Sequence, residues 1–423
     1  MIPALILFAV TYVLMLIFGK YRPCIALTSG LVFICTGMLP LEKILPSIDF
    51  NVLLMIIGTM GLVALFTESR MPMLLSDLIM ERVPNVKWAA VALSLFAGVI
   101  SAFVDNVATV LMIAPIGLSI CRKLKANPVP FIISIAVSSN LQGAATLVGD
   151  TTAIMLGSSL QMSFADFFWY HGRPGMFFMV ELGALLSALI LLFIFRRENA
   201  PVERQGERTK VTDPVPTVLL SLSLVCLIAV SFIPEKPSVT NGAICCALFA
   251  VGLVYKLLRT RRLPSLLPTL KEIDFITIGM LVGLFLMIGG IAEQGVIDAA
   301  ASLLSRVGGG NAFVLYTLIV WGSVVISAFI DNIPYVATML PVVAGLSPVL
   351  GMDPTPLYFG LLSGATLGGN CTPMGASANI TGIGILRREG YEVKNRDFFR
   401  IGIPFTLAAV IPVYILIWIC FGI

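Results

Sequence analysis

Hydrophobic residues form long stretches along the whole chain, and most polar residues are confined to the short segments between them. A helix needs roughly 17–25 apolar residues to cross a bilayer. Many of these stretches reach that length without the period-two alternation typical of membrane β-strands. The pattern therefore predicts an all-α polytopic membrane protein. The predicted uninterrupted spans are 3–18, 24–40, 50–67, 174–195, 216–233, 239–257, 275–292 and 401–420.

One short motif occurs twice, and each copy interrupts an apolar stretch with a charge. Residues Ser101–Val107 read Ser-Ala-Phe-Val-Asp-Asn-Val, and residues Ser327–Ile333 read Ser-Ala-Phe-Ile-Asp-Asn-Ile. An aspartate between apolar flanks is costly in lipid and is a functional candidate by default. Because the motif returns at the equivalent place in the second half, the sequence indicates a duplicated chain with a paired site.

The interrupted stretches predict two further elements in each half. The two apolar stretches with an Asp-Asn pair at their centre predict re-entrant hairpins at 88–120 and 312–348. Two others are too long for one simple span and contain glycines, which predicts discontinuous helices at 129–162 and 357–380. The resulting organisation is a first repeat at 1–198, a linker at 199–215 and a second repeat at 216–423.

Composition and charge distribution predict how the chain lies in the membrane. Hydrophobic residues make up 58% of the 423 residues and charged residues only 12%, and the net charge of +4 gives no indication of nucleic-acid binding. With the N-terminus outside and five crossings per half, nearly all of the 27 lysines and arginines lie on the cytoplasmic side. The four exceptions are Lys43, Arg173, Lys236 and Arg306. Since five is odd, we expect an inverted second repeat and both termini outside an inner or plasma membrane.

In such inverted-repeat transporters the site lies near the bilayer midplane, where unwound backbone surrounds a cavity. The polar side chains predicted there are Asp105, Asn106, Asp150, Thr151, Thr152, Asp331, Asn332, Asn370, Thr372 and Asn379. Oxygen ligands suit hard cations, so Asp105 with Asn106 and Asp331 with Asn332 are candidate sodium sites. Carboxylates at this depth are also candidate proton carriers. No lysine or arginine is predicted at the same depth, which favours a cationic or neutral substrate over an anion.

Other interpretations remain open for these residues. Asp105 and Asp331 could cap the helices that follow them by accepting backbone N–H bonds. Asn370 aligns with Asp150 when the two broken helices are compared by their Ala-Thr-Leu runs, so Asp150 is expected to lack a charged counterpart. The sequence predicts no cofactor beyond a coupling ion, H⁺ or Na⁺. It contains no Gly-x-x-x-x-Gly-Lys motif, which argues against ATP hydrolysis by this chain.

These motifs also carry a resemblance to a known superfamily. Ser-Ala-Phe-x-Asp-Asn, the run at 143–150 and the run at 367–379 resemble the ion transporter superfamily. The most similar branch contains arsenical-pump membrane proteins, NhaD-type sodium/proton antiporters and the melanosomal P protein. The resemblance implies a homodimer with a static scaffold and a transport domain of hairpins and broken helices that moves like an elevator. A separate ATPase subunit, as some arsenical pumps use, is a further partner that the resemblance leaves open.

Departures from the superfamily pattern bear on the substrate. The related sodium/dicarboxylate symporters carry Ser-Asn-Thr at both hairpin tips, whereas the triplets here begin at Asp105 and Asp331, whose charge would repel a carboxylate. We therefore predict proton-coupled antiport of a small cation such as Na⁺, or of a neutral oxyacid such as arsenite, and no enzyme activity. The alternatives are a Na⁺-coupled carboxylate or anion symporter and, more remotely, an intramembrane aspartyl enzyme.

Overall fold

The computed structural model describes residues 1–423 except 124–125, 202–207, 234–235, 351–352 and 423. In the first half, the helices are α1 (Ile2–Ile17), α2 (Arg22–Cys35), α3 (Ile44–Ser47), α4 (Phe50–Glu68), α5 (Met71–Met80), α6 (Val86–Ser101), α7 (Asn106–Lys123), α8 (Pro128–Gln142), α9 (Thr151–Ser159) and α10 (Met176–Ile194). Between α9 and α10 lie the short antiparallel strands β1 (Trp169–Tyr170) and β2 (Arg173–Pro174).

The second half repeats this order of helices. Its helices are α11 (Val215–Ser231), α12 (Thr240–Thr260), α13 (Leu266–Lys271), α14 (Phe275–Glu293), α15 (Val296–Val307), α16 (Ala312–Ser327), α17 (Asn332–Leu350), α18 (Thr355–Gly368), α19 (Ser377–Arg388) and α20 (Asn395–Phe421). Equivalent caps recur: Asp49 accepts from Val52 N at the start of α4, and Asp274 accepts from Thr277 N at the start of α14, both at 3.0 Å. The predicted all-α fold of two matching halves is confirmed.

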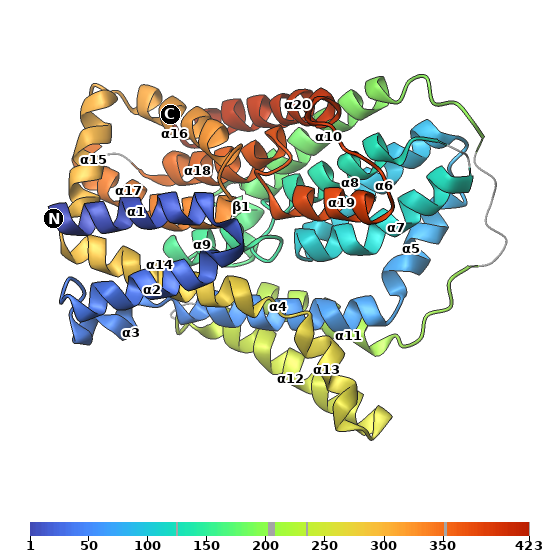
Figure 1. The fold of residues 1–423 in the computed structure, drawn as a ribbon, viewed down its shortest axis with the longest axis horizontal. Coiled ribbons are helices and arrows are strands. Elements are labelled where there is room, and N and C mark those ends of the chain that lie inside the picture. Colours follow the sequence, from blue (N-terminus) through green and yellow to red (C-terminus); the bar gives the residue numbers. More distant parts are fainter. Residues whose placement is uncertain (124–125, 202–207, 234–235, 351–352, 423) are drawn as a thin grey trace.

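The two halves lie in opposite directions along the molecule (Figure 1). The short helices α5 and α15 stand at opposite ends, with the longer helices running between them. The α6–α7 pair extends from the end that carries α5, and the α16–α17 pair from the end that carries α15 and both chain termini. This is the arrangement expected of an inverted duplication.

Helix lengths differ in part from the predicted spans. Among the described residues, six helices are long and apolar enough to cross a membrane, or up to seven if the bent α15–α16 pair counts as one span. The six are α4, α7, α10, α12, α14 and α20. The predicted span 24–40 is too long, because α2 ends at Cys35 and Gly37 follows with a φ of +72°, a conformation that terminates a helix. Ten crossings and two re-entrant hairpins remain predictions, and residues 202–207 of the predicted linker lie outside the described part of the chain.

Each half packs its fourth helix against the second helix of the other half. Gly58 of α4 approaches α12 so closely that a Cβ there would lie 2.4 Å from the Cys245 carbonyl carbon. Gly283 of α14 makes the equivalent approach to α2, with 2.4 Å to the Ala26 carbonyl carbon. Small residues allow such close helix packing without bulky side chains between the backbones. These two reciprocal pairs join the repeats.

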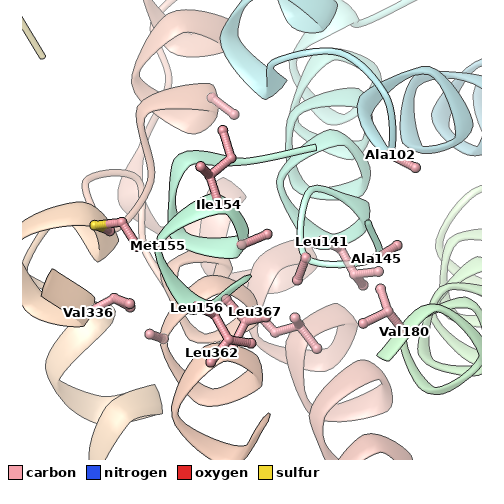
Figure 2. Close-up of a cluster of buried hydrophobic side chains, with 14 of the residues drawn as sticks. Ala102, Leu141, Ala145, Ile154, Met155, Leu156, Val180, Val336, Leu362 and Leu367 are labelled. Carbon is pink, nitrogen blue, oxygen red and sulfur yellow. The ribbon is translucent and has the colours of Figure 1, made fainter. Parts of the chain in front are cut away.

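Apart from the α4–α12 and α14–α2 pairs, a second group of elements packs together, which contains the hairpins and the interrupted helices. Figure 2 shows Leu156 of α9 next to Leu362 and Leu367 of α18, with Ile154 farther along α9. All four are buried, at 3% exposure or less. The core under the helix breaks is therefore built from both halves, which fixes the two breaks relative to each other.

Candidate functional site

Each hairpin tip is bound to the helix break of its own half by one threonine. Between α6 and α7, the carbonyl of Ala102 accepts a hydrogen bond from the Thr146 hydroxyl. Between α16 and α17, the carbonyl of Ala328 accepts from the Thr372 hydroxyl in the same way. Each threonine oxygen also accepts from the backbone N–H two residues later. The tips and breaks consequently form two equivalent rigid units.

This geometry corrects the predicted alignment of the two broken helices. Thr146 and Thr372 perform the same task, so Gly-x-x-Thr-x-x-Gly at 143–149 corresponds to Gly-x-x-Thr-x-x-Gly at 369–375. The next residue is the N-cap of the following helix, which is Asp150 for α9 and Ala376 for α19. The position of Asp150 is therefore taken by Ala376 and not by Asn370. The Ala-Thr-Leu runs that suggested the other alignment lie six residues out of register.

Gly149 and Gly375 are required where break and tip meet. A Cβ at Gly149 would lie 2.6 Å from Gly143 O and 2.9 Å from Ser101 O, and one at Gly375 would lie 2.6 Å from Gly369 O and from Ser327 O. These are backbone atoms, so relief requires the tip to move. We expect Gly149→Ala and Gly375→Ala each to lower the free energy of unfolding by about 1–3 kcal/mol, the usual range for overpacking.

Thermal unfolding of the purified variants would measure this loss. Gly384→Ala is the matched control, because a Cβ at that helical position meets no atom within 4 Å. The control should unfold at or slightly above the wild-type temperature, since alanine is the better helix former. Equal stability of all three variants would show that the close approach is not rigid.

A cavity of about 690 Å³ lies where the hairpin tips and the breaks meet the start of α14. Five of the ten predicted site residues line it: Asp105, Asn106, Asp150, Thr151 and Asn332. Its lining also includes Ser377 from the second break and Lys271, Glu272 and Asp274 from the α13–α14 segment. Four carboxylates and one exposed lysine make this cavity acidic, which favours cations.

Asp105 both caps a helix and faces the cavity. Its Oδ1 accepts from the backbone N–H of Val107 at 3.0 Å and of Ala108 at 3.1 Å, so the capping interpretation of this residue is confirmed. Among the described residues, no group hydrogen-bonds its Oδ2, and Asp105 lines the cavity. The cap therefore uses one oxygen and leaves the other for a ligand.

Asp150 connects the two halves across the cavity. Its Oδ2 accepts from the Thr152 hydroxyl at 2.7 Å and from Asn332 Nδ2 at 3.3 Å. Asn332 belongs to the second hairpin, so this carboxylate bridges a break of one half and a tip of the other. Asp150 is 4% exposed, and its hydrogen-bond donors within the described part of the chain are all neutral. Burial of a carboxylate without a cation is costly, as expected where a cation or proton binds.

Asp331 has a different environment, which corrects the prediction that no cationic side chain lies at this depth. Its Oδ2 is 3.1 Å from Nη1 of Arg22, the first residue of α2, and it also accepts from the Ser377 hydroxyl at 3.3 Å. Its Oδ1 caps α17 by accepting from Ile333 N at 3.2 Å. Asp331 does not line the cavity. The two aspartates are equivalent in sequence, but only Asp331 is neutralised by an arginine.

The remaining predicted residues are buried and do not line the cavity. Thr152 bonds Asp150 and Thr366, and Thr372 holds the second tip. Asn379 donates to the carbonyls of Gly369 at 3.1 Å and Thr372 at 3.2 Å, which secures the second break. Asn370 donates to Val137 O at 2.9 Å. Their observed contacts are structural.

Asn140 is a central residue that the sequence did not single out. It is fully buried, accepts from Asn106 Nδ2 at 3.1 Å, and donates to Thr366 O at 2.7 Å and Asn370 Oδ1 at 3.1 Å. The chain of amides thus runs from the first hairpin tip through α8 to the second break. Asn140 lies in an apolar stretch with no repeat counterpart of the same type, because the equivalent residue is Thr366. The polar character of Asn140 within that stretch was the only available signal.

The lining residues that the sequence did not predict include Ser377 and Asp274. Ser377 is the counterpart of Thr151 in the corrected alignment and could have been found by it. Asp274 occupies the same capping position as Asp49, and its place beside the hairpin tip depends on the packing of the halves. Over the residues that the structure describes, no group of three or more His, Cys, Asp or Glu is arranged to hold a metal ion.

Comparison with known proteins agrees with this fold. A model of the citrate transporter family, CitMHS, matches residues 12–364 and, in an overlapping match, 247–422. An uncharacterized transporter of Mycobacterium tuberculosis is 31% identical over 443 aligned residues, covering 98% of this chain and 97% of that protein. The human P protein is 26% identical over 448 residues, covering 87% of this chain and 53% of its own length.

A solved structure shows the same fold at low identity. The YdaH transporter of Alcanivorax borkumensis superposes with a TM-score of 0.61 at 14% identity, covering 89% of this chain and 87% of that one. The matches to the family model together extend over nearly the whole chain, and the mycobacterial relative covers it almost completely. The chain therefore belongs to the citrate transporter family, CitMHS, of the ion transporter superfamily, and it is a multi-pass secondary transporter.

Proposed function

We propose that this transporter couples the movement of a small cation, Na⁺ or a related ion, or of a neutral oxyacid, to a counterflow of protons. One observation carries this proposal: the cavity exposes Asp105 and contains Asp150, and neither carboxylate has a cationic partner among the described side chains. An anionic substrate would face both charges. A cation or proton that binds there offsets the cost of burying them.

The same arrangement supports a moving transport domain. The cavity lies between two groups of elements, with tips and breaks on one side and α4, α13 and the start of α14 on the other. We propose that the hairpins and broken helices move as one body against a scaffold of α1–α4 and α11–α14. The predicted repeat boundaries, 1–198 and 216–423, and a homodimer formed through the scaffold belong to this proposal.

We further propose that the cavity faces the cytoplasm in this conformation. It lies at the start of α14, the end of the molecule that also carries the basic segment after α12. The loop before α11 is bound to the same end, because Thr212 N donates to Ser69 O at 3.0 Å and Arg259 pairs with Asp213. Most predicted cytoplasmic charges lie there, consistent with the positive-inside rule. Both termini would then lie outside.

The family description, citrate transporter, favours a carboxylate substrate, and the alternative proposal is then a Na⁺-coupled carboxylate symporter. Arg22 is the cation that such a substrate would need, but Asp331 already occupies it in this conformation. Symport would require that pair to open and the arginine to reach the substrate. The two proposals differ in driving force: an imposed pH gradient should drive Na⁺ through the antiporter, whereas an imposed Na⁺ gradient should drive citrate through the symporter.

Flux into proteoliposomes under imposed pH and Na⁺ gradients tests the proposal. We expect Na⁺ entry to be driven by an outward proton gradient and to collapse when a protonophore dissipates it. Liposomes that lack the protein are the control for leakage. Citrate uptake driven by an inward Na⁺ gradient, without proton counterflow, would contradict the proposal and support the symporter.

A further inference from the structure

A second cavity of about 370 Å³ adjoins the acidic cavity and shares Asp105 with it. We call it the apolar annex. Residues common to both cavities are Met60, Asp105, Ala108, Leu111 and Glu272. The annex extends from the Asp105 carboxylate between α4 and α7, and it ends at α5.

The walls of the annex are mostly hydrocarbon and sulfur. From α4 they include Val63 and Ala64, from α7 Leu111 and Met112, and from α5 Met73. The polar side chains at its wall are largely engaged elsewhere. The Thr67 hydroxyl donates to Val63 O at 2.9 Å, and Glu68 pairs with Lys256 and accepts from Thr269 at 2.9 Å. Asp105, on the hairpin tip, and Glu272, on the scaffold side, are therefore the two carboxylates that a cationic ligand can meet at the junction of the two cavities.

An inorganic ion gives no reason for such an annex. Na⁺ or a small oxyacid needs a few oxygen ligands, and apolar walls next to it would only be left in contact with water, which is unfavourable. The annex, at about 370 Å³, falls in the range of volumes that hold organic ligands, roughly 300–1,000 Å³ with apolar walls and few polar groups. Methionine-lined walls adapt readily to ligands of different shape.

We propose that the site binds an amphipathic organic cation, with its ammonium group at Asp105 and its apolar part in the annex. This inference rests on the proposed cation site and narrows its substrate class. A lipid acyl chain could also fill an apolar space, but it would bring no positive charge to Asp105. Charge complementarity at the junction favours the cation.

Binding of primary alkylammonium ions to the protein in nanodiscs of zwitterionic lipid would test this inference. Isothermal titration calorimetry should give a dissociation constant that falls with chain length from methyl- to hexylammonium, by about fourfold for each methylene that is buried. Empty nanodiscs measure partition into lipid, which is subtracted. A dissociation constant independent of chain length would overturn the inference.

Two variants alter the annex in opposite directions. Ala64→Phe should fill it and flatten the chain-length dependence. Leu111→Ala should enlarge the annex and shift the chain length that binds most tightly to longer alkyl groups. Because the Leu111 side chain is 44% exposed, this truncation is compatible with folding, and it keeps the test available if Ala64→Phe does not fold. Chain-length dependence unchanged in Leu111→Ala would count against the annex as the binding place.

Asp105→Asn separates this inference from the proposed function. It should weaken binding of every alkylammonium ion by a similar factor, because it removes the charge and not the annex. Suppose that Asp105→Asn binds alkylammonium ions as tightly as the wild type does, and that the dissociation constant still falls with chain length. The annex then holds apolar chains without using the charge of Asp105, and the inference fails. If alkylammonium ions do not bind but Na⁺/proton exchange still depends on Asp105, the proposed function stands and only the substrate class is wrong.

Discussion

Asp105→Asn is expected to abolish coupled transport while leaving the fold intact. Asparagine has almost the same shape as aspartate and is an equally good N-cap, so it can still accept from the backbone N–H groups of Val107 and Ala108. The substitution removes only the charge that faces the cavity. A hydrogen bond to a charged group contributes about 1.5–3 kcal/mol, so cation binding should weaken about 10- to 100-fold.

Flux in proteoliposomes and thermal unfolding of the same preparation separate transport from stability. The matched control is Asp353→Asn, which also removes a capping carboxylate: Asp353 accepts from the backbone N–H and the hydroxyl of Thr355, at 2.9 and 2.6 Å, and does not line the acidic cavity. The control should transport normally. If Asp105→Asn also retained coupled flux with an unchanged pH profile, Asp105 would be a cap alone.

Removal of Arg22 is expected to be strongly destabilising, and removal of Asp331 together with it should restore stability. In Arg22→Gln the Asp331 side chain, only 9% exposed, would keep its charge without a cation. Breaking a buried pair from one side costs about 3–5 kcal/mol, and we expect the lower end because Arg22 is 23% exposed. The double variant Arg22→Gln/Asp331→Asn leaves no uncompensated charge.

Thermal unfolding of the two single variants and the double variant forms a double-mutant cycle that isolates the pair. Asp331→Asn alone should be milder, because the exposed part of Arg22 can be hydrated. Transport by the double variant then decides the role of Asp331. A stable but inactive double variant would indicate that the pair must open and close during transport, whereas full activity would make the pair purely structural. Additive losses of stability would contradict a direct interaction.

Much of the fold was accessible from the sequence. Long apolar stretches predict membrane helices because lipid offers no hydrogen bonds to an unfolded backbone. The repeated Ser-Ala-Phe-x-Asp-Asn motif predicts duplication, and the interrupted stretches predict hairpin tips and helix breaks at the places where α6–α7, α8–α9, α16–α17 and α18–α19 have them. Half of the candidate residues line one cavity. Polar side chains are costly inside a membrane, so those that interrupt apolar stretches tend to mark a functional site.

Only the tertiary structure decided the alignment of the two broken helices and the ion-pair partner of Asp331. Matching Asp150 with Asn370 followed an Ala-Thr-Leu run that is coincidental, whereas the Thr146 and Thr372 contacts fix the true alignment on Ala376. Arg22 reads as an ordinary flanking charge, and its approach to Asp331 joins residues 309 positions apart in the chain. The local sequence determines which segments form membrane helices and where those helices are capped or interrupted. Which side chain neutralises which charge depends on how the two halves pack together.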